Sequence, residues 1–150
     1  MYNRVTAADV AALQAICGQT NVLCGEAINP EYAHDELGDV RAMPEVVVRV
    51  GSTEEVSTVM KLAWEKTIPV TVRGSGTGLV GAAVPIHGGI LLETTSMNKI
   101  LALDPDNLTV HGSAAQIAWI RIVGVSTMIP SAGSKTVPQR DSSSRMYRSR

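Results

Sequence analysis

The sequence predicts an α+β fold in which a glycine-rich loop joins two kinds of local structure. Residues 46–73 have the pattern of strand, helix and strand, whereas residues 89–110 have the pattern of short strands joined by tight turns. Between these stretches, four glycines lie within residues 74–81. The chain has 150 residues, of which 45% are hydrophobic, and this is the size of one globular domain.

The first expected element is a helix near the N-terminus. Thr6, with Asp9 three residues later, is typical of a helix start, and Gly18 marks the end of the helix. Between them, apolar residues recur at helical spacing: Val10, Leu13, Ile16 and Cys17. Residues 21–38 mix turn formers with polar residues and have no sustained period, so we expect an irregular surface segment there.

A βαβ unit follows. Residues 44–50 are rich in valine, which predicts a short strand buried on both faces. Ser52 and Glu55 form a capping-box pattern, and apolar residues recur at helical spacing from there to Lys66. Residues 68–73 predict the next strand. We therefore expect a parallel pair of strands connected by a right-handed crossover helix.

Beyond the βαβ unit, the chain favours short strands and tight turns. Residues 89–93 predict a short strand, and residues 97–103 lead to a turn over 104–107 and a further strand over 108–110. Trp64, on the crossover helix, is expected in the hydrophobic core rather than at a ligand.

The candidate site is the glycine-rich loop directly after the strand at 68–73. It consists of Arg73, Gly74, Ser75, Gly76, Thr77, Gly78 and Leu79. Glycine takes positive φ readily and lets a ligand approach the backbone, and consecutive free N–H groups form an anion-binding concavity. Open α/β sheets bind ligands at the carboxyl ends of their strands. The loop therefore predicts a phosphate or pyrophosphate site, and the alternative is a loop without a ligand.

Two other phosphate motifs fit this loop less well. A P-loop requires a lysine after its second glycine, and no lysine follows any glycine here. Gly76, Gly78 and Gly81 match the GxGxxG pattern, and Glu93 lies where a ribose-binding acid sits in a Rossmann fold. Residues 82–89, however, are too few and too rich in glycine and proline for the helical crossover of that fold.

Other kinds of site are not indicated. Cys17 and Cys24 lack the spacing of a zinc site or a redox pair, so we expect free buried thiols. His34, His87 and His111 have no partner pattern of a metal site or a nucleophilic site. We therefore predict no catalytic residue and no metal-binding residue in this chain.

The C-terminal residues differ in composition from the rest of the chain. Residues 134–150 hold five basic residues against one acidic residue, and residues 140–150 have almost nothing to bury, so we expect a disordered tail. A modest positive charge without a folded basic face does not favour nucleic-acid binding. No apolar run approaches a membrane-spanning length and the N-terminus lacks a secretory signal pattern, so we expect a cytoplasmic protein without a transmembrane segment.

Seven stretches of the chain together carry a family resemblance. They are Tyr-Ala-His-Asp at 32–35, 41–48, 52–56, the strand and loop at 68–79, 88–90, 97–101 and 106–109. In this order and spacing they resemble the flavin-dependent oxidases and dehydrogenases that share an FAD-binding domain of the vanillyl-alcohol oxidase or p-cresol methylhydroxylase (PCMH) type. Within that family the chain resembles the FAD subunit of glycolate oxidase and its D-lactate dehydrogenase relatives.

The resemblance implies a cofactor and a reaction. It implies that Arg73 to Leu79 wrap the pyrophosphate of FAD through backbone amides. Thr77 stands where covalently flavinylated relatives carry a histidine, so it implies noncovalent FAD. It further implies an oxidoreductase that moves a hydride from the α-carbon of a 2-hydroxy acid, glycolate or D-lactate, to the flavin. Full-length relatives often work with partner subunits, and the sequence leaves the substrate, electron acceptor and oligomeric state open.

The likeness ends near Val110. Relatives continue with a second half of the FAD domain and a substrate-binding cap, and residues 111–150 resemble neither. We therefore expect residues 1–110 to be a partial PCMH-type domain, its first α/β subdomain, and residues 111–150 to be divergent, out-of-frame or disordered. A chain truncated in this way is expected to lack turnover by itself. The alternative is a non-catalytic nucleotide-binding fragment or remnant.

Overall fold

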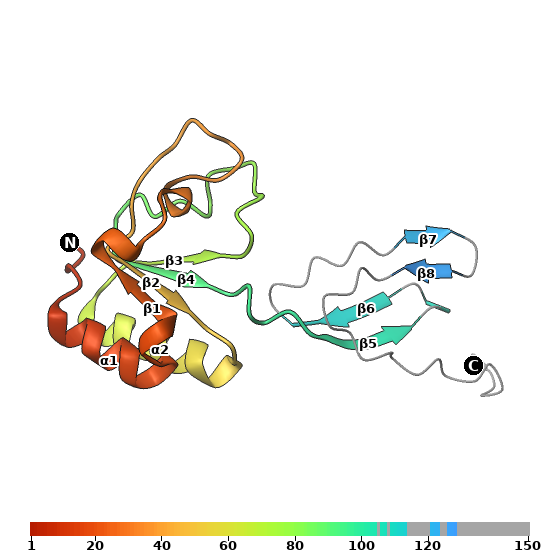
Figure 1. Ribbon diagram of the computed structural model, residues 1–150, viewed down its shortest axis with the longest axis horizontal. Coiled ribbons are helices and arrows are strands. Elements are labelled where there is room, and N and C mark those ends of the chain that lie inside the picture. Colours follow the sequence, from red (N-terminus) through yellow and green to blue (C-terminus); the bar gives the residue numbers. More distant parts are fainter. Residues whose placement is uncertain (105, 108, 114–120, 124–125, 129–150) are drawn as a thin grey trace. The chain divides into compact units, whose positions relative to one another are not determined.

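The computed structural model describes residues 1–104, 106–107, 109–113, 121–123 and 126–128 (Figure 1). The chain divides into two units, Met1–Ile117 and Ala118–Arg150. The first unit contains a four-stranded sheet whose strands are, in order across the sheet, β1 (Val22–Cys24), β2 (Val46–Arg49), β4 (Ile90–Glu93) and β3 (Val70–Arg73). The predicted α+β class is confirmed.

Three of the four strands run parallel and end at one edge of the sheet. β2 and β3 each pair with β4 in parallel, and β1 pairs with β2 in antiparallel. The prediction that the strands flanking the crossover helix form a pair is wrong, because β4 lies between them. The registers align Arg49, Glu93 and Arg73 across the sheet. The last residues of these three strands therefore lie next to one another at the carboxyl edge.

The sheet buries a different set of residues on each face. The larger cluster combines residues of two helices with alternate strand positions: Leu13, Cys17, Val46, Val48, Val59, Ala63, Ile90 and Leu92. On the other face Val47 and Leu91 pack with Ile28, and Tyr32 lies against them. The valine-rich strand is thus buried on both faces, as predicted. Trp64 is 86% exposed, so its predicted place in the core is wrong.

Both predicted helices form, and Figure 1 shows them on the same face of the sheet. They are α1 (Ala7–Cys17) and α2 (Thr53–Lys66). Thr6 and Asp9 form the predicted capping box of α1. Ser52 accepts a hydrogen bond from the N–H of Glu55 at the start of α2, but the Glu55 carboxylate accepts from Gly51 instead of Ser52. Neither of these two described helices has the length and hydrophobicity needed to span a membrane.

The segment before β2 is more structured and more buried than its composition predicts. It holds β1 and the short helices η1 (Gln19–Asn21), η2 (Gly25–Ala27) and η3 (Pro30–Ala33). Ile28, Ala33 and Asp35 are buried. The expectation of an irregular surface segment over 21–38 is therefore wrong, because β1 extends the sheet and the residues after it cover the face that the helices leave free.

A hairpin follows the sheet along the chain. β5 (Ile100–Asp104) pairs in antiparallel with β6 (Thr109–Gly112), close to the predicted strands. The Asp104 carboxylate accepts hydrogen bonds from the N–H groups of Asp106 and Asn107 in the turn. In the second unit, β7 (Arg121–Val123) pairs in antiparallel with β8 (Ser126–Met128). The predicted tail at 140–150 lies outside the described residues, as does most of the segment 111–150.

Candidate functional site

The glycine-rich loop leaves β3 at the carboxyl edge of the sheet, where the sequence places it. Among the described residues, no acceptor takes a hydrogen bond from the backbone N–H groups of Gly74 to Leu79. Within the loop, the hydroxyls of Ser75 and Thr77 lie 3.4 Å apart. A run of free N–H donors in such a turn forms a concavity suited to the oxygens of a phosphate. The predicted residues 73–79 therefore present the kind of donors that a pyrophosphate needs.

Arg73 places a buried positive charge at the base of this loop. The residue is only 8% exposed. Its Nη1 donates to the carbonyl of His34 at 2.6 Å and its Nη2 to the carbonyl of Glu31 at 3.1 Å. The ring of Tyr32 lies 5.8 Å from its Cζ. No carboxylate in the described part of the chain forms an ion pair with Arg73. A buried cation held only by carbonyls and a ring favours an anion near it.

Gly76 packs directly on the Arg73 guanidinium. Its φ of +80° lies in the region that favours glycine. A Cβ atom added at this position would overlap Nη2 and Cζ of Arg73. The loop backbone therefore approaches the buried cation more closely than any other residue type allows.

A supporting segment, residues 31–38, holds the loop at both of its ends. At the start of the loop, the carbonyls of the segment hold Arg73, as described above. At the far end, the N–H of Glu36 donates to the carbonyl of Gly78 at 3.1 Å. A Cβ on Gly81 would lie 3.5 Å from Cδ2 of Leu37, so the next turn also contacts the segment. Of the atoms in these contacts, only the carbonyl of Gly78 belongs to the loop backbone, so none of them uses a loop N–H group.

Asp35 is a buried acid in the supporting segment. It is 3% exposed, and its Oδ1 accepts a hydrogen bond from the N–H of Leu37 at 3.1 Å. Its Oδ2 has no hydrogen-bond partner within the described ranges. A Cβ on Gly78 would lie 3.6 Å from that oxygen. Gly76 of the loop therefore lies against the buried Arg73, and Gly78 lies against the buried Asp35.

A second polar cluster occupies the carboxyl ends of β2 and β4. Glu93 Oε2 accepts hydrogen bonds from the Tyr32 hydroxyl at 2.5 Å and from Arg49 Nε at 3.0 Å, while Oε1 accepts from the Thr95 hydroxyl at 2.6 Å. Burial raises the pKa of Glu93, but these hydrogen bonds outweigh it and hold the pKa below its ordinary value. Burial and the bond to Glu93 raise the pKa of Tyr32. Near neutral pH the pair is therefore a carboxylate and a neutral phenol.

The two cysteines lie in surroundings that keep their thiols protonated. Cys17 and Cys24 are free, as predicted, but only Cys17 is buried, so the expectation of a buried thiol is wrong for Cys24. Burial raises the pKa of Cys17 to about 11, and partial burial also raises the pKa of Cys24. Thiols with raised pKa values are poor nucleophiles near neutral pH. The described residues contain no group of three His, Cys, Asp or Glu side chains suited to a metal ion.

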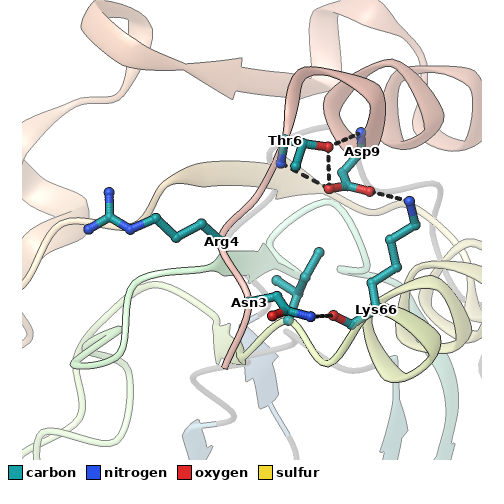
Figure 2. Close-up of a pocket in the computed structure, with 6 residues that line it drawn as sticks. Asn3, Arg4, Thr6, Asp9 and Lys66 are labelled. Carbon is teal, nitrogen blue, oxygen red and sulfur yellow. Dashed lines mark hydrogen bonds and ion pairs between the residues drawn. The ribbon is translucent and has the colours of Figure 1, made fainter. Parts of the chain in front are cut away.

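A groove of about 450 Å³ lies at the opposite, amino end of β3 (Figure 2). Figure 2 shows Arg4 pointing away from the other polar groups, which bind one another. Asp9 Oδ1 pairs with Lys66 Nζ at 2.7 Å, and Asp9 Oδ2 accepts from the hydroxyl of Thr6 at 2.7 Å. Asn3 Nδ2 donates to the carbonyl of Lys66 at 2.8 Å. The interactions in the groove therefore hold the N-terminal residues against α2, and they leave few polar groups for a ligand.

The Asp9→Asn variant tests how much the interactions of Asp9 with Thr6 and Lys66 stabilise the fold. The hydrogen bonds from Lys66 and Thr6 lower the pKa of Asp9 from 3.8 to about 2. A carboxylate with a lowered pKa stabilises the fold above its unfolded pKa and loses that contribution as the pH falls. We expect Asp9→Asn to cost about 2 kcal/mol of unfolding free energy at pH 7, the equivalent of a pKa lowered from 3.8 to about 2. Urea unfolding should show this difference shrinking between pH 4 and pH 2. The exposed Asp39→Asn is the control, and equal losses in both variants would contradict the account.

Three residues of the surrounding structure were not predicted as site residues, and of these Tyr32 and Asp35 lie against Arg73 or the loop. Tyr32 and Asp35 lie in the segment expected at the surface, and Arg49 was considered only as part of a strand. One signal was present in the sequence. Arg49, Arg73 and Glu93 each end a short strand rich in valine or leucine, and parallel strands bring their carboxyl ends to one edge.

The part of the chain that contains the loop is similar to known proteins. Residues 44–117 match the FAD binding domain family. The chain is 46% identical over 110 residues to a D-lactate dehydrogenase of Anaerostipes hadrus, a match that covers 73% of this chain and 23% of that protein. It is 37% identical over 78 residues to the glycolate oxidase subunit GlcD of Bacillus subtilis, covering 52% of this chain and 17% of that subunit.

The fold also matches that of solved structures. The structure of p-cresol methylhydroxylase with substrate bound aligns with a TM-score of 0.56 and 29% identity, over 68% of this chain and 21% of that chain. The chain thus spans about a fifth of the length of the proteins that it matches. The resemblance stated from the sequence is confirmed.

Proposed function

Because residues 44–117 belong to the FAD binding domain family, we propose that the loop from Arg73 to Leu79 binds the pyrophosphate of FAD. The chain carries the FAD-binding domain of a flavin-dependent oxidoreductase related to D-lactate dehydrogenase and glycolate oxidase. The observation that supports the placement of the cofactor is the run of backbone N–H groups over 74–79 that find no acceptor among the described residues.

The loop offers the pyrophosphate backbone donors and, at Arg73, a buried positive charge. FAD carries negative charge on its two phosphates, and the loop offers N–H dipoles over a buried guanidinium that has no carboxylate partner among the described residues. Gly76 lets the backbone lie against that guanidinium. Arg73 therefore acts from inside the protein as a counter-charge, while its side-chain donors hold the supporting segment.

The reaction that we propose is carried out by longer proteins of the kind that the matched relatives represent. Bound FAD supplies the acceptor for a hydride from the α-carbon of a 2-hydroxy acid, glycolate or D-lactate. The role of this chain in that reaction is to bind the pyrophosphate of the cofactor. We also propose that FAD is bound noncovalently, because Thr77 offers no imidazole for attachment to the flavin.

Competition between fragments of the cofactor tests the proposal. The full chain is added to FAD and binding is followed by flavin fluorescence. ADP, which carries a pyrophosphate, should displace FAD reversibly, whereas riboflavin, which has no phosphate, should not. Absence of FAD binding, or displacement by riboflavin as strong as displacement by ADP, would overturn the assignment of the loop.

A further inference from the structure

We infer that Tyr32 is a positioning residue for the pyrophosphate loop, a role that rests on the function proposed above. The residue does not belong to the loop and lies 41 positions before Arg73 in the sequence. It connects the polar cluster at the ends of β2 and β4 to the guanidinium on which Gly76 packs. Tyr32 holds Arg73 in place, and Arg73 in turn holds the conformation of the loop.

The hydroxyl of Tyr32 is held from the sheet. It donates to Glu93 Oε2 at 2.5 Å and accepts from Arg49 Nη2 at 3.2 Å. Glu93 is itself held by Arg49 Nε and by the hydroxyl of Thr95. Hydrogen bonds to charged groups are stronger and more directional than neutral ones. The position of the phenol ring is therefore set by the last residues of two central strands.

The other contacts of Tyr32 and its neighbours reach Arg73. The ring lies 5.8 Å from the Arg73 Cζ, within the range of a cation–π contact. Glu31 and His34, which flank Tyr32 in and after η3, present the two carbonyls that accept from Arg73. A shift of η3 would move both carbonyls together. Fixing Tyr32 therefore fixes all the described partners of the guanidinium.

The Tyr32→Phe variant separates this role from simple packing. The ring packs against the cluster of Ile28, Val47 and Leu91, and phenylalanine keeps those apolar contacts. Only the hydroxyl and its bonds to Glu93 and Arg49 are lost. Tyr2→Phe is the matched control, because Tyr2 is exposed and its hydroxyl has no hydrogen-bond partner among the described residues.

The experiment measures the affinity of the full chain for FAD in both variants. We expect Tyr32→Phe to weaken binding about tenfold, because the binding-competent conformation of the loop would be populated only about a tenth of the time, and Tyr2→Phe to leave it unchanged. Glu93→Gln should weaken binding in the same direction. Thermal unfolding of each variant shows whether the protein is folded. Unchanged affinity in folded Tyr32→Phe would overturn the inference, whereas absence of FAD binding by the wild-type chain would instead overturn the proposed function.

A double-variant cycle with Arg73→Lys tests whether Tyr32 acts through Arg73. Lysine keeps the charge at position 73 but cannot hold two carbonyls in the fork geometry of arginine. If Tyr32 acts through the guanidinium, Tyr32→Phe should change FAD affinity less than about twofold in the Arg73→Lys background. The full tenfold loss in that background would overturn the inference, because the two residues would then act independently.

Discussion

Replacing Gly76 by alanine is expected to weaken FAD binding at least about 100-fold, because the change displaces the buried cation under the loop. The added Cβ would overlap Nη2 and Cζ of Arg73. To make room, the guanidinium must leave the carbonyls of Glu31 and His34, or the loop must lift away from it. Either movement increases the distance between the loop N–H groups and the positive charge of Arg73. The loss is measured by titrating the folded variant with FAD.

The control for Gly76→Ala must carry backbone strain without the overlap. Gly18 has a φ of +89°, and a Cβ there would meet its nearest atom, Asn21 Nδ2, at an ordinary 3.8 Å. Gly18→Ala should therefore lower stability without lowering the FAD affinity of the folded protein. If the two variants bind FAD equally well, the contact between Gly76 and Arg73 has no role in binding.

Replacing Gly89 by alanine is expected to have the largest effect on folding, a loss of more than about 3 kcal/mol of unfolding free energy. Its φ is +70°, and a Cβ would overlap the carbonyl oxygen of Pro69, an atom of the backbone. That oxygen accepts the hydrogen bond from Ile90 that begins the β3–β4 pairing. The Gly89 carbonyl accepts from the N–H groups of Glu45 and Val46. The substitution therefore disturbs the start of all three parallel strands.

Urea unfolding compares Gly89→Ala with Gly25→Ala. Gly25 also has a positive φ, +56°, but a Cβ there meets nothing within 4 Å. We expect a loss of no more than about 1 kcal/mol in that control. Similar losses at the two positions would mean that backbone strain alone, and not the crowding at Pro69, sets the effect.

The local elements were predictable from the sequence because their signals are local. Thr6 and Asp9 are three residues apart, and the bonds that begin α1 join these same residues. The glycine spacing after residue 73 predicted a loop able to offer backbone N–H groups, and the structure gives those groups no partner among the described residues. The short connection over 82–89 also argued correctly against a crossover helix there.

Contacts between distant residues could not be predicted in the same way. The sequence predicts that β2, β3 and β4 exist, but periodicity does not indicate that β4 inserts between the other two. Tyr32 donates a hydrogen bond to Glu93, which is 61 positions away in the sequence, and the residues next to Tyr32 do not indicate that partner. Asp35 has the composition of a surface turn, and only its placement against Gly78 buries it. The missed residues are those whose surroundings come from other segments.

The central claim, that the backbone N–H groups of residues 74–79 hold the pyrophosphate of FAD, is tested most directly by NMR. A ¹⁵N-labelled sample of the full chain is titrated with FAD, and the amide shift of each residue is followed. We predict that the largest saturable shifts occur at Gly74 to Leu79, with smaller ones in the supporting segment 31–38. Saturable shifts confined to the groove around Asp9, or no saturable shift in the loop, would contradict the claim.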